Sequence, residues 1–583
     1  MKLTIVDWAI IGTYFLFNLL IGFYYKSKAG ANVSEFFLSG RNVPWWLAGT
    51  SMVATTFAAD TPLVVTGLVA KYGIAGNWLW WNMVASGMLT VFLFARLWRR
   101  SGVTTDIELA ELRYAGKPAA FLRGFRSIYL GVLMNCIILG WVNLAMVKIL
   151  GLVLGISKGQ ALWVVVGIIA LTSFISGLSG LWGVLVTDLF QFFVKMTMVI
   201  VLAVAAVHAV GGMEAMKAKL GGAGSSFLSF VPDIPSVWMP AVTFFVYIAV
   251  NWWATWYPGA EPGGGGYVAQ RMFSAKDERN SLLATLWFNV AHYALRPWPW
   301  VLVGMASVIL YPHLADPETG YVRVMIDYLP PSLRGLMVAA FAAAFMSTVG
   351  TQLNWGASYL VNDFYRRFLY RDESERHYVV VSQIATVLLT VISAVVTWHM
   401  DSIAGAWKLL IATGAGTGLV LILRWYWWRI NAWSEVSAMA AAFVVSIALQ
   451  TVFGFDSDNP TQFAYIILIT VGITTVVWFA ATFLTAPESD ATLVAFYRRV
   501  RPSPFGWKRV ARLAPEVPVS HDLGWNLLDW LSGCVMIYGA LFGIGKLILL
   551  DYATGAVFVA VAIAAGSVIY WDLTRRGWAS VME

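Results

Sequence analysis

Apolar runs of about 20 residues recur along the whole chain, separated by short polar segments. A helix needs about 20 apolar residues to cross the hydrocarbon core of a bilayer. The runs therefore predict an all-α polytopic membrane protein. We expect about fifteen spans, near residues 5–25, 44–68, 78–98, 125–154, 161–179, 183–210, 238–257, 283–311, 335–361, 378–399, 403–425, 434–455, 462–484, 525–549 and 554–572.

Composition agrees with this class, because 59% of the 583 residues are hydrophobic and only 12% are charged. A soluble domain usually carries about 25% charged residues. Cys136 and Cys534 lie inside apolar runs, so the sequence predicts neither a disulfide framework nor a metal-ligand cluster. The first run is followed by Tyr-Tyr-Lys-Ser-Lys rather than a cleavage site, and we expect it to be retained as a span.

Basic residues gather on one side of the predicted spans, in segments such as RLWRRSG, QRMFSAKDER and FYRRVRPSPFGWKRVAR. The positive-inside rule makes that side cytoplasmic, with the N-terminus outside and the C-terminus inside the plasma (inner) membrane. The net charge of +8 is then an orientation signal, and no nucleic-acid partner is expected. The polar segment 485–524 is the only long loop, so no soluble catalytic domain is predicted.

Two predicted spans are interrupted in the same way. The first runs LAGTSMVATTFAADTPLVVTG, where polar residues and Pro62 break the apolar pattern. The second runs into NWWATWYPGAEPGGGGYVAQR, which cannot hold a continuous helix. Irregular backbone at membrane depth persists only where protein or a watery cavity satisfies it. Four spans follow each break, a pattern typical of inverted-repeat secondary transporters with the binding site at the breaks.

This pattern predicts a five-plus-five core with one extra N-terminal span and about four C-terminal ones. We expect the chain to divide into five segments. They are an N-terminal span and cytoplasmic loop (1–43), the first repeat with core helices 1–5 (44–210), an extracellular loop (211–237), the second repeat with core helices 6–10 (238–428) and C-terminal accessory spans with the loop 485–524 (429–583).

Four ordered motifs resemble those of the sodium:solute symporters, which share the inverted-repeat fold of the leucine transporter. They are FFLSGRNVPWWLAGTSMVA, GLSGLWGVLVTDLFQ, YVAQRMFSAKDERNS and AAAFMSTVGTQLNWGASYLVNDFYRR, and together the likeness covers roughly residues 5–430. The resemblance implies one sodium ion between the first and eighth core helices. Its ligands would be the carbonyls of Ala54, Phe57 and Ala344 and the hydroxyls of Ser347 and Thr348.

Sodium suits such a site, because a hard cation prefers oxygen ligands and neutral oxygens release it readily. The alternative is that these hydroxyls simply bond back to a carbonyl one turn earlier. The resemblance also implies a possible second cation site at Asp188 and Thr351. Gly350 offers no side-chain oxygen there, and Lys195 lies two turns after Asp188, so we expect that site to be weak and one sodium to accompany each solute.

The sequence specifies the solute less closely than it specifies the coupling ion. Trp80 stands where sugar-transporting relatives carry an acid, and His292 or Tyr293 replaces their lysine, which disfavours a galactose-like substrate. Arg296 within a span either pairs with Asp60 or Glu261, snorkels, or binds a carboxylate. Trp253 and Trp256 either pack or line the cavity. The candidate solute-binding residues are Thr56, Asp60, Thr61, Trp80, Trp253, Trp256, Glu261, Asn289, His292, Tyr293 and Arg296.

The predicted function is sodium-coupled import of a small organic solute, a sugar or a carboxylate-bearing compound, by alternating access within a lipid bilayer. Sodium is the only metal or cofactor expected, with no organic cofactor. A receptor or regulatory module on a transporter fold is the main alternative. A membrane-embedded enzyme is disfavoured, because five of the six histidines lie at span ends or in loops and His292 alone lies at membrane depth.

Overall fold

The computed structural model describes residues 3–29, 39–103, 105–221, 225–518 and 522–578. Within these residues the chain is helical apart from one isolated bridge between Val43 and Ala275, and the all-α expectation is confirmed. In the part of the chain that the structure describes, ten helices are long and apolar enough to cross a membrane, or twelve if each of two bent helix pairs is one span. Three shorter apolar helices, at Ile5–Ile21, Lys158–Ser173 and Ala241–Ala254, fall where further spans are expected. The count of about fifteen stays a prediction.

The first part of the chain forms a bundle that contains the first break. Its elements are α1 (Ile5–Ala29), η1 (Ser39–Arg41), α3 (Trp45–Thr56), α4 (Asp60–Tyr72), η2 (Ile74–Asn77), α5 (Trp78–Trp81), α6 (Val84–Leu89), η3 (Thr90–Phe94), α7 (Ala95–Ser101), α8 (Leu109–Arg113), α9 (Gly116–Ile128), η4 (Tyr129–Met134), α10 (Asn135–Leu154), α11 (Lys158–Ala209) and α12 (Met213–Leu220).

The second part contains the second break and ends at a third bend. Its elements are α13 (Ala241–Phe245), η5 (Val246–Asn251), α14 (Trp252–Ala254), α15 (Gly266–Ser274), α16 (Glu278–Asn289), η6 (Val290–Leu295), α17 (Pro297–Leu310), η7 (Pro317–Thr319), α18 (Gly320–Tyr328), α19 (Leu333–Ser358), η8 (Tyr359–Leu369), α20 (Glu375–Trp398), α21 (Ile403–Gly414) and α22 (Thr417–Tyr426).

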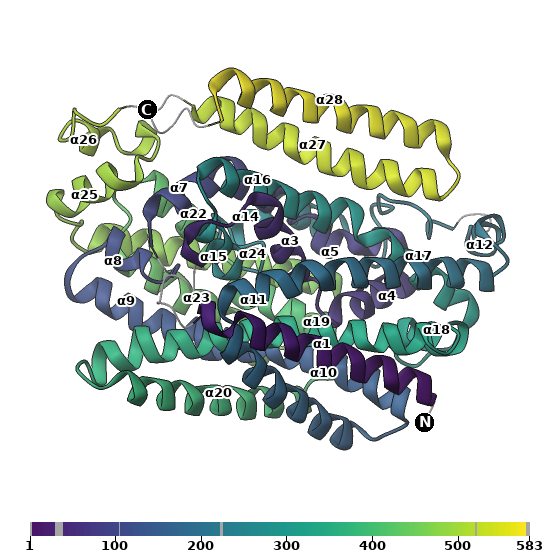
Figure 1. The fold of residues 1–583 in the computed structure, drawn as a ribbon. Helices are drawn as coiled ribbons and strands as arrows, with labels where there is room; N and C mark the ends of the chain where they lie inside the picture. Colours follow the sequence, from purple (N-terminus) through teal and green to yellow (C-terminus); the bar gives the residue numbers. More distant parts are fainter. Residues whose placement is uncertain (1–2, 30–38, 104, 222–224, 519–521, 579–583) are drawn as a thin grey trace.

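The remaining helices follow the third bend. They are α23 (Ala432–Thr451), α24 (Pro460–Leu484), α25 (Asp490–Val500), η9 (Pro504–Gly506), α26 (Lys508–Ala511), α27 (Leu523–Ile548) and α28 (Tyr552–Arg576). Figure 1 shows α27 and α28 side by side along one edge of the bundle, with α20 along the opposite edge. The expected loop 485–524 contains the short helices α25 and α26. It is anchored by the buried Trp507, whose ring nitrogen donates to the carbonyl of Trp425 at 2.8 Å.

The first break separates α3 from α4 over Phe57–Ala59 and bends the span by 59°. Asp60 begins α4, and its negative charge complements the positive end of that helix dipole. Pro62 falls in the first turn of α4, where a backbone N–H would have no helical partner. The sequence therefore ends one helix and starts another, and carbonyls at the end of α3 accept additional hydrogen bonds from other elements.

The second break extends from Thr255 to Gly265, between α14 and α15. Gly263 and Gly264 have φ angles of +81° and +79°, which only glycine adopts without strain. The backbone groups of this segment bond to a third bend, between α21 and α22, where the chain turns by 51°. Gly416 N donates to Ala254 O at 2.7 Å, and Trp256 N donates to Gly414 O at 3.3 Å. The two irregular segments thus satisfy each other.

Two elements differ from the expectation. The run 403–425 is expected as one continuous span, whereas the structure bends it at Gly416, because the amide there donates to the second break rather than along its own helix. The runs 161–179 and 183–210 are expected as two spans; both lie on one helix of 52 residues, α11, with Lys158–Ser173 and Trp182–Ala209 as its two apolar stretches, so their number as spans stays a prediction. The side chains of residues 174–181 lie outside the described part of the chain.

Candidate functional site

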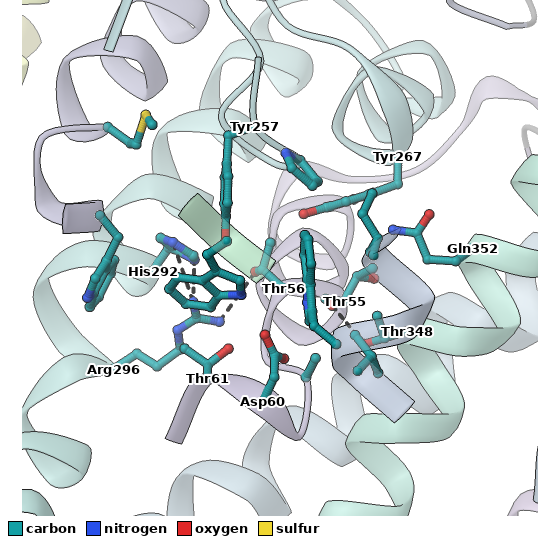
Figure 2. A pocket seen from close by; sticks show the side chains of 18 of the residues that line it. Thr55, Thr56, Asp60, Thr61, Tyr257, Tyr267, His292, Arg296, Thr348 and Gln352 are labelled. Atoms are coloured by element: carbon teal, nitrogen blue, oxygen red, sulfur yellow. Dashed lines mark hydrogen bonds between the residues drawn. The ribbon is translucent and has the colours of Figure 1, made fainter. Parts of the chain in front are cut away.

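A cavity lies at the first break, enclosed by α3, α4, α5, α10, η6, α19 and the second break (Figure 2). Its lining residues come from segments far apart in the chain. They are Thr55, Thr56, Ala58, Asp60, Thr61, Trp80, Met83, Ile138, Trp141, Val142, Tyr257, Pro258, Tyr267, His292, Tyr293, Arg296, Thr348, Gln352 and Trp407. Both broken helices contribute to this lining, as the matched interruptions predict.

Arg296 is the cation of the cavity, and it is fully buried. Its Nη1 donates to Val53 O and Thr56 Oγ1, both at 3.3 Å, and its Nη2 lies 2.5 Å from His292 Nδ1. The guanidinium stands over the ring of Trp300, 5.0 Å from its centroid. Arg296 therefore clamps the C-terminal end of α3, where a positive charge is favoured by the helix dipole.

The carboxylate of the cavity is Asp60, which is 4% exposed. Among the described residues its Oδ1 has no hydrogen-bond partner, and neither has the Nε of Arg296. Among the described residues, Arg296 forms no ion pair with Asp60 or Glu261, the two partners considered from the sequence. A buried acceptor and a buried donor without partners are costly unless a ligand or water satisfies them, so both point to an occupant of the cavity.

Aromatic rings form two walls of the cavity. Trp80 stacks on Tyr293, with ring centroids 5.8 Å apart and planes at 24°. On the other wall Trp141 and Tyr257 stand nearly parallel, at 6.5 Å and 6°. Such rings offer flat apolar faces while their polar tips can still bond a solute. Figure 2 shows the ring of Tyr257 directed toward Asp60 and Arg296, so that the aromatic and charged groups share one space.

The structure brings together most of the eleven candidate solute-binding residues. Seven line the cavity, namely Thr56, Asp60, Thr61, Trp80, His292, Tyr293 and Arg296. Four lie outside its lining. Trp253 donates to Ala249 O, Trp256 borders a smaller pocket beside Gly414, Glu261 accepts from Gly259 N, and Asn289 donates to Thr285 O.

Sequence reasoning missed several lining residues. Tyr257 and Tyr267 flank the Pro- and Gly-rich break, and Gln352 lies one helical turn after Thr348, so proximity to the motifs could have found these three. Trp141 and Trp407 carry no local signal, because no break or motif interrupts the helices in which they stand. Only the packing of α10 and α21 against the breaks identifies them.

The predicted sodium ligands gather where α3 meets α19. Thr348 Oγ1 lies 3.1 Å from Thr55 O and 3.0 Å from Ala344 O, to either of which it can donate. The carbonyls of Ala54 and Phe57 are already engaged, because Lys195 Nζ of α11 donates to them at 3.1 and 3.3 Å. Lys195 thus bonds two of the carbonyl oxygens that were expected to hold sodium.

Asp188 lies next to this cluster and is 1% exposed. It accepts hydrogen bonds from Ser51 at 2.6 Å and Ser347 at 2.8 Å. Its nearest cation is the buried Arg271 of α15, with Nη2 3.9 Å from Oδ2. The sequence pointed to Lys195 as the group that neutralises Asp188, whereas the ion pair in the structure is with Arg271, a residue of the YVAQRMF motif whose role the sequence did not reveal.

The model of the sodium:solute symporter family matches residues 36–444. The sodium/glucose cotransporter 4 of Danio rerio is 24% identical over 548 residues, which are 84% of this chain and 80% of the relative. The high-affinity proline transporter PutP of Bacillus subtilis is 25% identical over 34% of this chain and 41% of its own length.

One solved structure shares the fold. It is the substrate-bound, outward-open state of a Na⁺-coupled sialic acid symporter, which superposes with a TM-score of 0.67 at 18% identity. The match covers 83% of this chain and 99% of that one. The expected transporter fold is therefore confirmed.

Proposed function

This chain belongs to the sodium:solute symporter family, and from that membership we propose that it imports a small organic solute by sodium-coupled symport with alternating access. The observation that carries the proposal is the cavity at the meeting point of the two broken helices. Transporters of this architecture hold their solute at such breaks, near the middle of the membrane.

The cavity favours a solute that carries a carboxylate or a set of hydroxyls. The unpartnered Nε of Arg296 suits an acidic oxygen, and the unpartnered Oδ1 of Asp60 suits a hydroxyl or amino donor. The stacked rings of Trp80 and Tyr293 can cover a flat or ring-shaped body. These features support a sugar, a sugar acid or an amino acid. Glucose, proline and sialic acid, the solutes for which the similar proteins are named, belong to the same range.

For the coupling ion we propose a single sodium between α3 and α19. Its oxygens would be the carbonyls of Ala54, Phe57 and Ala344 and the hydroxyls of Ser347 and Thr348. The contact of Thr348 Oγ1 with Thr55 O supports this assignment, since it brings the hydroxyl to the C-terminal end of α3. Sodium at this place neutralises the negative end of the helix dipole, as a cation does at other helix C-termini.

The test is solute counterflow with the purified full-length chain in proteoliposomes. Labelled glucose, glucuronate, proline and sialic acid are compared in sodium and in choline at equal ionic strength. We expect counterflow of at least one of them, and accumulation that depends on an inward sodium gradient. If the protein binds a solute, seen as thermal stabilisation, but exchanges none, it is a receptor and the transport proposal is wrong.

A further inference from the structure

The segment between α24 and α27, which we call the basic lobe (residues 485–518), carries an excess of positive charge that the proposed transport does not use. It contains six basic and three acidic residues. The acidic residues each accept a hydrogen bond from another group of the protein, and they are Glu488, Asp490 and Glu516. Lys508 and Arg512 are exposed, and neither forms an ion pair with any residue that the structure describes.

The basic lobe is packed firmly against the ends of the core helices. Trp507 is buried, and its ring nitrogen donates to Trp425 O at 2.8 Å. Arg113 of α8 stands over the ring of Trp507, 4.8 Å from its centroid. Arg100 of α7 donates to Val500 O at 2.9 Å. The lobe therefore presents its cations in a set arrangement, and a ligand that binds them orders less of the chain than it would in a mobile loop.

The stretch 507–514 of the basic lobe has two different faces. The buried face has the spacing i, i+3 and i+7 of one side of a helix, and it consists of Trp507, Val510 and Ala514. The exposed face carries three cations and one apolar side chain, namely Lys508, Arg509, Arg512 and Leu513. Phe505, just before this stretch, is 74% exposed. Cations beside large exposed apolar side chains are typical of segments that lie at a membrane surface.

Contacts with the neighbouring spans place this face at the edge of the bilayer. Trp428 N donates to Gly506 O at 3.2 Å, and the guanidinium of Arg509 stands over the ring of Trp428, 4.6 Å from its centroid. The adjacent Trp427 packs on Phe483, which is exposed in the last turn of α24. Tryptophans gather where hydrocarbon meets headgroups. Figure 1 shows α25 and α26 at one end of the bundle, as this placement requires.

We propose that the exposed face of the basic lobe binds the headgroups of anionic phospholipids, with Lys508 and Arg512 as the cations and Phe505 and Leu513 as apolar anchors. A lipid offers phosphate and hydrocarbon together, whereas a free phosphate compound would use the cations and leave the apolar side chains in water. Both ends of the lobe continue into membrane helices, so the lipid surface is always at high effective concentration. The inference goes beyond the proposed symport and does not depend on which solute is carried.

The experiment titrates the purified full-length protein, in a neutral detergent, with phosphatidylglycerol or with phosphatidylcholine. The measurement is the lipid concentration that gives half-maximal thermal stabilisation. We expect phosphatidylglycerol to act at the lower concentration, and its advantage to shrink as salt is added. In Lys508→Gln/Arg512→Gln the concentration of phosphatidylglycerol should rise roughly 30-fold, since each cation near an anionic surface contributes about fivefold.

Lys117→Gln/Lys276→Gln is the matched control, because it removes the same charge from two exposed lysines outside the basic lobe. It should titrate like the wild type. Phe505→Ser should weaken the binding of phosphatidylglycerol roughly tenfold and leave its salt dependence unchanged, since it removes an apolar anchor.

Three results would overturn the inference. They are equal stabilisation of the wild type by the two lipids, equal weakening in the two double variants, and stabilisation by soluble glycerol 3-phosphate at the concentrations at which phosphatidylglycerol acts, which would identify a free phosphate compound as the ligand. If the lobe variant fails to fold, the wild-type titrations with both lipids and glycerol 3-phosphate decide alone. Solute counterflow reports on the symport separately, so its failure leaves the lipid measurement intact.

Discussion

Arg296 offers the sharpest test of how the cavity selects its solute, through the substitution Arg296→Gln. The guanidinium has two kinds of contact in the structure. It holds the end of α3 through Val53 O and Thr56 Oγ1, and it carries an Nε that lacks a partner among the described residues. The first role concerns stability and the second concerns recognition, so the two can be measured apart.

The magnitudes follow from these contacts. A hydrogen bond to a charged group contributes about 1.5–3 kcal/mol, so losing the bond between Arg296 and a solute carboxylate should weaken binding of an acidic solute by roughly 10- to 100-fold. A neutral solute of the same shape loses no such bond. Loss of the two contacts with α3 should lower the free energy of unfolding by about 1–3 kcal/mol whatever the solute.

Glucuronate and glucose are the matched pair of solutes, and their uptake is compared in proteoliposomes that contain equal amounts of folded protein. Arg271→Gln is the matched control, because Arg271 is equally buried but lies outside the cavity lining and pairs with Asp188. It should reduce stability without separating the two solutes. If Arg296→Gln weakens both solutes by the same factor, Arg296 acts only as a clamp on α3 and the recognition argument is wrong.

Three further predictions concern the surroundings of the cavity. Thr348→Ala should raise the half-saturating sodium concentration about tenfold, while Thr348→Ser, which keeps the hydroxyl, should stay near the wild type; equal values in both would remove Thr348 from the site. Asp188→Asn should leave the ratio of one sodium per solute unchanged. It should lower the free energy of unfolding by about 3 kcal/mol or more, because the buried Arg271 loses its ion-pair partner. In the double variant with Arg271→Gln, thermal unfolding should show part of that stability restored. Gly416→Ala should destabilise the protein, because the φ angle of Gly416 is +88° and an added Cβ would lie 2.6 Å from Cβ of Thr474 in α24. Gly472→Ala is the control: Gly472 lies on the same helix as Thr474, its added Cβ would meet nothing within 4 Å, and the variant should unfold like the wild type.

Features that depend only on the local sequence, such as the membrane helices and two of their breaks, could be predicted. Runs of about 20 apolar residues specify membrane helices, and Pro62 together with the glycines after Pro262 specifies where two of them break. The third bend was not predicted although Gly414, Gly416 and Gly418 stand there, because glycine is tolerated within a membrane helix. Its amide leaves the helical pattern only because Ala254 O of another segment accepts it.

The candidate site shows the same limit. Spacing along α11 puts Lys195 two turns from Asp188, which suggested a pair within one helix. The structure directs the two side chains to different partners, because carbonyls at the end of α3 lie beside Lys195 and Arg271 of α15 lies beside Asp188. Neither neighbour is close in sequence. Contacts between helices that are far apart in the chain decide the chemistry of this site, and no local pattern encodes them.

The end of α3 also explains how solute and cation can influence each other over a short distance. Val53 O binds Arg296 of the solute cavity, and the next carbonyl, Ala54 O, binds the ammonium of Lys195. Because both lie on one turn of α3, a solute that draws Arg296 away from Val53 O changes the negative potential felt at Ala54 O. Linkage requires the effect to be reciprocal, so whichever cation occupies the site must alter solute affinity by the same factor. If solute and cation bind at the places proposed here, the adjacent carbonyls of Val53 and Ala54 give a direct electrostatic route between them.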